Sequence, residues 1–159
     1  MKELRKLSKN IAIDTGPLLL PLTREAGWES VKKILYMHER GELTLHVGLF
    51  NIGELASATY KLGFDAETAL SYAKLVSEKL SVVEGTSYAM WLGMLRIESY
   101  RSKYNIPWGD ISSASAALSM NIPVIVLGKD DHFKLLAKLC SNLGKTIRVI
   151  KVEDLQNLL

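Results

Sequence analysis

The fold is decided by residues 108–133, WGDISSASAALSMNIPVIVLGKDDHF, where one helix leads directly into a buried strand. Pro107 interrupts any helix that arrives from upstream. Asp110 then opens a helix whose small residues at 112–117 are typical of close packing. The apolar, β-branched run at 122–127 has the pattern of a buried parallel strand. This stretch therefore predicts an α/β fold.

Acidic residues stand at both ends of this helix–strand unit. Asp110 lies at the helix start, and Asp130 and Asp131 lie just beyond the strand, where another helix begins. In open α/β sheets, ligands bind beyond the carboxyl ends of the strands. One carboxylate at a helix start and two after the next strand therefore predict a functional site.

Strands and helices alternate along the rest of the chain. Further strands are expected at 11–13, 43–47, 80–83 and 146–150. Helices are expected at 25–40, 50–62, 66–80, 86–104, 133–143 and 152–159. This alternation favours a parallel sheet with helices on both faces. We expect one α/β domain, a three-layer α/β/α sandwich, over residues 1–159 with its core at about 10–150.

Composition excludes several classes of protein. With 48% hydrophobic and 23% charged residues, the chain resembles a soluble globular protein. No apolar run approaches the roughly 18 residues of a membrane span, and the N-terminal residues lack a signal peptide's apolar centre. The single Cys140 excludes an internal disulfide framework and is expected to be buried. We expect a cytoplasmic protein whose net charge of +3 permits binding to nucleic acid without requiring it.

Two more acids are placed to join the site. Asp14 ends the first strand, where it either contributes to a ligand site or caps the helix that follows. Glu54 lies on a helix among apolar neighbours, an unusual setting for a carboxylate. Asn51, one helical turn earlier, is expected to orient Glu54 by a hydrogen bond.

Clustered carboxylates repel one another unless a cation neutralises them. Oxygen ligands favour hard ions, so Mg²⁺ or Mn²⁺ is the expected cofactor. Such an ion activates water and offsets the charge that builds on a phosphate during its transfer. The sequence contains no Cys/His cluster, GxSxG or GxxxxGKS motif for a rival chemistry. The acids therefore predict phosphodiester hydrolysis.

The order of these motifs resembles PIN-domain ribonucleases, and within them the VapC toxins of prokaryotic toxin–antitoxin pairs. The matching pieces are Ile11-Ala12-Ile13-Asp14-Thr15, Asn51-Ile52-Gly53-Glu54-Leu55, Trp108-Gly109-Asp110-Ile111 and Val126-Leu127-Gly128-Lys129-Asp130, followed by Phe133. The resemblance implies an RNA substrate, a homodimer and a partner antitoxin that covers the acidic groove.

The resemblance also implies roles for individual residues. The metal-binding and catalytic acids would be Asp14, Glu54, Asp110 and Asp130, supported by Thr15, Asn51 and Asp131. Asp130 is preferred to Asp131 because it lies three residues before Phe133, as in the family pattern. The sequence departs from that pattern at Gly128, usually Thr or Ser, and at His132, often an acid.

Other readings of the motifs remain. Residues 14–16 match an aspartic-protease signature, but that fold is all-β. A haloacid-dehalogenase-like phosphatase needs a second Asp where Gly16 stands. A housekeeping RNA-processing nuclease, or a degenerate PIN domain that binds RNA or protein without cutting, would carry the same motifs.

The expected helix at 86–104 has a basic side formed by Arg96, Arg101 and Lys103. A phosphate backbone could pass there on its way to the carboxylates. The aromatic residues of this helix are expected to lie in the core instead of stacking on bases.

Overall fold

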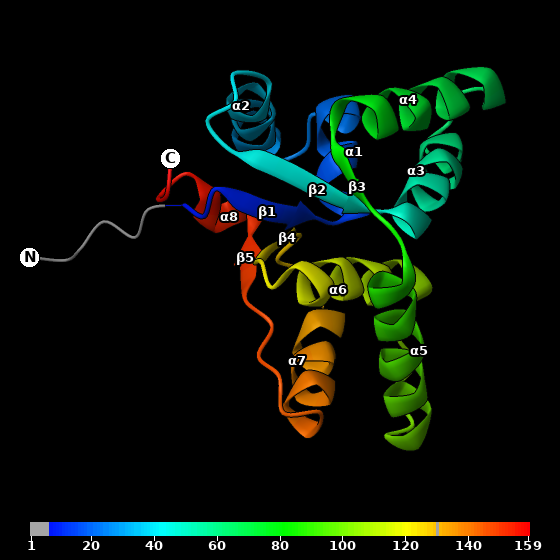
Figure 1. The fold of residues 1–159 in the computed structure, drawn as a ribbon. Helices are drawn as coiled ribbons and strands as arrows, with labels where there is room; N and C mark the ends of the chain where they lie inside the picture. The colour runs from blue at the N-terminus through cyan, green and yellow to red at the C-terminus, as the bar shows by residue number, and fades with distance from the viewer. Residues whose placement is uncertain (1–6, 130) are drawn as a thin grey trace, which may run out of the picture.

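A computed structural model describes residues 7–129 and 131–159 and contains a five-stranded, wholly parallel sheet (Figure 1). The spatial order of its strands is β3-β2-β1-β4-β5. The strands are β1 (Asn10–Ile13), β2 (Thr44–Gly48), β3 (Ser81–Val83), β4 (Val124–Val126) and β5 (Val149–Lys151).

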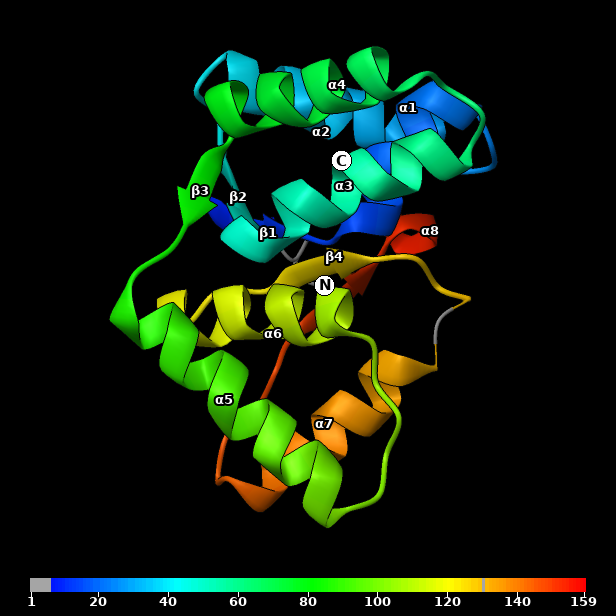
Figure 2. The same cartoon turned by 90° about the vertical axis from the view of Figure 1, so that its right-hand side faces the viewer.

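Helices cover both faces of this sheet. The helices are α1 (Thr15–Thr23), α2 (Trp28–Glu39), α3 (Leu49–Lys61), α4 (Ala66–Lys79), α5 (Thr86–Arg101), α6 (Trp108–Met120), α7 (His132–Asn142) and α8 (Val152–Leu155). Figure 2 shows α1 to α4 above the sheet and α5 to α7 below it. The predicted α/β/α sandwich is confirmed.

Several element boundaries differ from the sequence prediction. Strand β5 begins at Val149, later than predicted, because its ladder pairs residue for residue with the three residues of β4. Helix α8 ends at Leu155 instead of residue 159, since only Val152 and Leu155 bury side chains that hold it in place. Helix α5 begins at Thr86, as expected, with Gly85 at its N-cap position at a φ of 94°, and it ends at Arg101 instead of residue 104.

The central strands are buried on both faces, which explains their continuous apolar sequence. Ile125 of β4 joins the core beneath α1 and α2, with Ile13 and Leu45. Val124 and Val126 point to the opposite face and join the core formed with α6 and α7. Successive residues of a strand face opposite sides, so three residues of β4 supply both cores.

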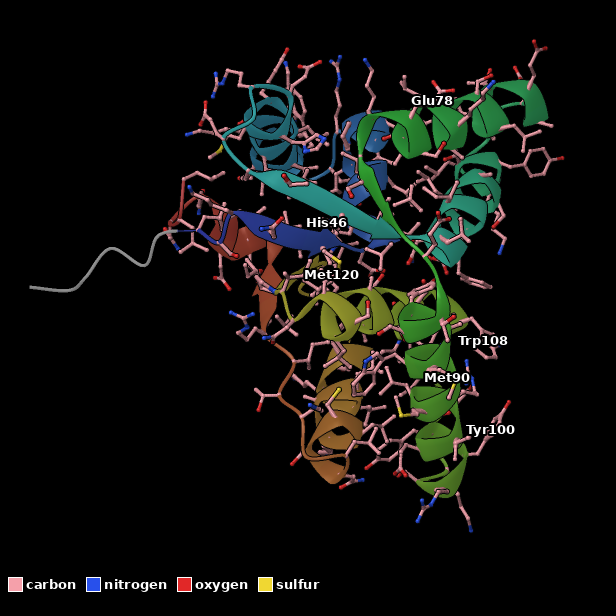
Figure 3. All side chains as sticks on the ribbon, in the orientation of Figure 1. His46, Glu78, Met90, Tyr100, Trp108 and Met120 are labelled. Atoms are coloured by element: carbon pink, nitrogen blue, oxygen red, sulfur yellow. The ribbon has the colours of Figure 1, made fainter. Side chains whose placement is uncertain are left out.

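Cys140 of α7 is fully buried in the lower core, as predicted, and is a free thiol. Two histidines, His38 and His46, also make structural contacts. His38 accepts a hydrogen bond from the Leu45 N–H at Nδ1, so Nε2 carries its hydrogen and donates to the Lys79 carbonyl at 2.7 Å. His46, labelled in Figure 3, lies with Nε2 3.0 Å from Oδ1 of Asn10. Burial, followed by the proximity of His38, lowers the pKa of His46.

Helix α6 is buried along most of its length, from Gly109 through Ala117. Its small side chains allow it to pack closely against α5, α3, β1 and β2. Ser115 tolerates this burial because its hydroxyl donates to the Ile111 carbonyl one turn earlier, at 2.7 Å. The predicted tightly packed helix is therefore confirmed.

The direction of chain crossover reverses between β1 and β4, which are neighbours in the sheet. Helix α1 leaves β1 on the upper face and α7 follows β4 on the lower face (Figure 1). In doubly wound sheets, such a switch point opens a crevice at the carboxyl ends of the strands.

Among the described residues, no helix is long and apolar enough to cross a membrane.

Candidate active site

Asp14 lies at the switch point, directly after β1. It occupies the N-cap position of α1, but its side chain makes no capping hydrogen bond there. Instead, Oδ1 accepts a hydrogen bond of 2.5 Å from the hydroxyl of Ser113 on α6. The residue is 6% exposed. Of the two roles that the sequence allows for Asp14, side-chain capping of α1 is not observed, and ligand binding stays a prediction.

Asp110 lies one turn before Ser113 on α6, so both residues face the same side of that helix. The Asp110 side chain is 12% exposed, and Oδ2 lies 2.8 Å from Nδ1 of His132, at the start of α7. An ionised carboxylate can only accept, so Nδ1 of His132 then carries the hydrogen. Two carboxylates from β1 and α6 are thereby held by side chains of α6 and α7.

Asn51 is fully buried where the starts of α1, α3 and α6 meet. Its Nδ2 donates to Oγ1 of Thr15 at 3.0 Å and to the Gly109 carbonyl at 3.1 Å. Its Oδ1 accepts from Oγ of Ser112 at 2.6 Å. These bonds position α6 relative to α1, and none of them goes to Glu54, contrary to the expectation that Asn51 orients Glu54. Thr15, which was predicted as a supporting residue, contacts Asn51, and its role in the site stays a prediction.

Tyr88 of α5 extends this buried network. The Phe50 N–H donates to its hydroxyl at 3.1 Å, and that hydroxyl lies 2.5 Å from Oγ of Ser112. Because Ser112 already donates to Asn51, the Tyr88 hydroxyl donates to Ser112. Gly48 closes the network, since a Cβ there would lie 2.7 Å from Oγ of Ser112. The sequence interpretation identified neither Gly48 nor this role of Tyr88.

Glu54 is partly buried on α3 and lies against the backbone of α6. A Cβ on Gly109 would come within 1.7 Å of Oε2 of Glu54, so the absence of a side chain at 109 allows the approach. Gly109 directly precedes Asp110. Glu54 is therefore adjacent to the start of α6, where it lines a pocket of about 520 Å³ with Leu49, Phe50, Gly53, Ser57, Trp108 and Gly109.

The two aspartates after β4 have different outcomes. Asp130, predicted as the fourth acid, lies outside the described residues. The Asp131 side chain is 85% exposed and lies 3.3 Å from Nζ of Lys134, at the surface. A Cβ on Gly128 would lie 2.6 Å from Oε1 of Glu153, the end of an exposed and flexible side chain.

Ser113 and His132 make the contacts to the acids that the sequence interpretation did not assign. Ser113 was predicted only as part of a closely packed helix, and His132 only as a departure from a family pattern. For Ser113 the sequence does hold a signal: it follows Asp110 by one helical turn, so the two residues share one side of α6.

Within residues 7–129 and 131–159, no three His, Cys, Asp or Glu side chains are grouped closely enough to hold a metal ion. The oxygen donors of Asp14 and Asp110 still suit a hard divalent cation.

The fold and this edge of the sheet define a class: a five-stranded parallel α/β/α sandwich with buried acids at its switch point.

No protein-family model and no curated protein matches the sequence. Solved structures do match. The chain is similar to one in the DNA-bound VapBC complex of Salmonella typhimurium, with a TM-score of 0.67 and 16% identity over 91% of this chain and 99% of that one.

Two further solved structures agree. A chain of the VapBC2 complex of Rickettsia felis, bound to a promoter DNA fragment, matches with a TM-score of 0.64 and 15% identity, over 89% of this chain and 98% of that one. A chain of VapBC-5 from Mycobacterium tuberculosis, of the VapBC family of toxin–antitoxin systems, matches with a TM-score of 0.57 and 17% identity over 91% and 99%. At the level of the fold, the predicted PIN-like, VapC-like resemblance is confirmed.

Proposed function

We propose that this protein is a metal-dependent endoribonuclease that acts as the toxin of a toxin–antitoxin pair. One observation carries the proposal: Asp14 and Asp110, both buried carboxylates, converge through α6 at the switch point of the sheet. Burial of carboxylates is costly, and such groups accumulate at functional sites. The similarity in fold to chains of VapBC complexes supports the toxin assignment.

In this proposal Asp14, Asp110 and Glu54, with Asp130, hold one or more Mg²⁺ or Mn²⁺ ions. A bound ion would supply an activated water and offset the negative charge that builds on the phosphate. The oxygen-only chemistry of these carboxylates suits Mg²⁺ and Mn²⁺ better than softer metals.

The protein's own side chains maintain the arrangement. Ser113 and His132 orient the carboxylates of Asp14 and Asp110 by hydrogen bonds. The Asn51 network keeps the starts of α1 and α6 in place. In the reaction a water oxygen bonds to phosphorus, the P–O bond to the leaving sugar oxygen breaks, and a base accepts the water's proton. A carboxylate of the cluster can act as that base.

Cleavage of single-stranded and structured RNA with Mg²⁺ or Mn²⁺ tests the proposal. Asp14→Asn and Asp110→Asn should each reduce cleavage by about 100-fold or more, because each removes a charge from the site. Glu29→Gln, an exposed acid on α2, is the matched control and should cleave like the wild type. Circular dichroism verifies that each variant folds.

Cleavage that survives both substitutions would remove this mechanism. RNA that is bound but remains uncut with either metal would instead favour a degenerate binding module. Release of phosphate from small phosphomonoesters, without RNA cleavage, would favour a phosphatase.

A further inference from the structure

An exposed aromatic pair lies beside the acids. Phe50 of α3 and Trp108 of α6 are each 45% exposed, and their ring centroids are 6.2 Å apart with a tilt of 40°. Figure 3 shows Trp108 projecting from the side of the molecule where α5 and α6 meet. Both rings line the pocket that contains Glu54.

The pocket is large enough to admit a flat group. Its two rings are tilted by 40° instead of stacked face to face, and both rings line it. Gly53 supplies part of the lining without a side chain, and a Cβ placed there would meet no atom within 4 Å. The volume of about 520 Å³ exceeds that of a single amino-acid side chain and suits a small planar ligand.

A cation lies against the same aromatic surface. The guanidinium carbon of Arg96 is 4.1 Å from the Trp108 ring centroid and 5.6 Å from the Tyr100 ring centroid. Arg96 forms no ion pair among the described residues, and its Nε is buried without a hydrogen-bond partner there. Arg101, by contrast, is paired with Glu98 at 3.0 Å. Because Arg101 is already paired and Arg96 is not, Arg96 is the better candidate of these two arginines to contact a phosphate.

The prediction that the aromatic residues of α5 lie in the core holds for Tyr88 but is wrong for Tyr100. Tyr88 is 4% exposed and belongs to the buried network, whereas Tyr100 is 68% exposed. Helical spacing shows which residues share one side of a helix, but not whether another helix packs on that side. In the described structure no helix covers the side that carries Tyr100. Figure 3 shows Trp108 and Tyr100 along the same side of α5.

We infer that this pocket binds an unpaired nucleobase of the substrate, an inference that rests on the proposed cleavage of RNA. Trp108 and Phe50 supply stacking surfaces, and Arg96 attracts a neighbouring phosphate. Glu54 lines the pocket, so the bound base belongs to a nucleotide near the phosphate that is cut. A base inside a duplex is stacked on both sides and cannot enter. The substrate class is therefore RNA with an accessible single-stranded or looped nucleotide.

Binding measurements test the inference separately from cleavage. In an Asp14→Asn background, which prevents cutting, affinity is measured for a labelled single-stranded oligoribonucleotide and for a fully paired duplex. Trp108→Ala should weaken binding of the single strand by about tenfold, the usual scale of one base–aromatic stack. Binding of the duplex should not change, and Trp108→Phe should retain most of the affinity.

The matched control is Tyr60→Ala, which removes a more exposed aromatic ring from α3 outside the pocket. It should leave both affinities unchanged. An oligoribonucleotide with abasic sites provides the second half of a double-mutant cycle: its binding should be insensitive to Trp108→Ala. Thermal unfolding verifies each variant, and Phe50→Ala gives an independent test if Trp108→Ala fails to fold.

Equal single-strand affinity in Trp108→Ala, Phe50→Ala and Tyr60→Ala overturns the base pocket, while cleavage that depends on Asp14 and Asp110 leaves the proposed function intact. Binding that depends on Trp108 without any cleavage supports the pocket and overturns the nuclease. If Trp108→Ala instead converts a dimer to monomers in sedimentation, with unchanged RNA affinity, the aromatic surface is a protein interface and the inference fails.

Discussion

Asp14 illustrates how far local sequence can go. Its position after a strand and before a helix suits both capping and ligand binding, and the sequence favours neither. In the structure its carboxylate accepts a hydrogen bond from Ser113, 99 residues away in the chain, and does not cap α1, while ligand binding stays a prediction. The acids could be predicted from residue type and motif spacing. The side chains that hold them could not, because serine and histidine have many other uses in a fold.

Cys140 supports a prediction at the scale of one residue. Burial raises the pKa of this thiol from 9.0 to about 11, so at pH 8 it stays protonated and unreactive. A thiol reagent should modify it slowly in the folded protein and rapidly in guanidinium chloride. Because the folded state keeps this proton more tightly, the free energy of unfolding should fall as pH rises from about 9 towards 11. Rapid modification of the native protein at pH 8 would contradict this.

Gly48 directly precedes helix α3 and Gly53 lies within it, and the two glycines differ in how much space surrounds them. A Cβ at Gly48 would press on Oγ of Ser112 and Oδ1 of Asn51, at 2.7 and 2.8 Å, inside the buried network. A Cβ at Gly53, in the middle of the helix, would meet nothing. The two glycines are therefore a matched pair for the same substitution.

Gly48→Ala should lower the free energy of unfolding by about 1–3 kcal/mol, the usual cost of overpacking. Gly53→Ala should raise it by about 0.5–1 kcal/mol, because alanine favours the helix. Urea denaturation followed by circular dichroism measures both changes. Equal shifts in the same direction would show that the network does not constrain the start of α3.

Helix α6 is the element on which the site depends most. The sequence predicted its start and its small-residue packing, since both follow from local composition. It did not predict that the carbonyl of Gly109 would bind Asn51, or that Glu54 would lie on the Gly109 backbone. Those contacts depend on how α3 of the upper layer meets α6 of the lower layer, which is set by the packing of both layers on the sheet.

At the scale of the whole molecule, the proposed toxin should have a protein partner. We expect the product of a short reading frame directly upstream to co-purify with this chain and to suppress its RNA cleavage. The Asp14→Asn variant should still bind that partner, since the substitution removes one charge from a larger interface. Failure of the two proteins to associate, with cleavage unaffected, would remove the toxin–antitoxin part of the proposal. Sedimentation of the isolated chain tests the expected homodimer.

The sequence by itself determined that this chain would alternate strands and helices around a parallel sheet, and which acids stand at the ends of its elements. Hydrophobic periodicity and breaker residues are local, so they can be read along the chain. Only the tertiary structure decided the strand order, the burial of Asn51 and the exposure of Trp108 beside Glu54. Each of these depends on contacts between segments far apart in sequence, whose relative positions are set by packing of the whole core.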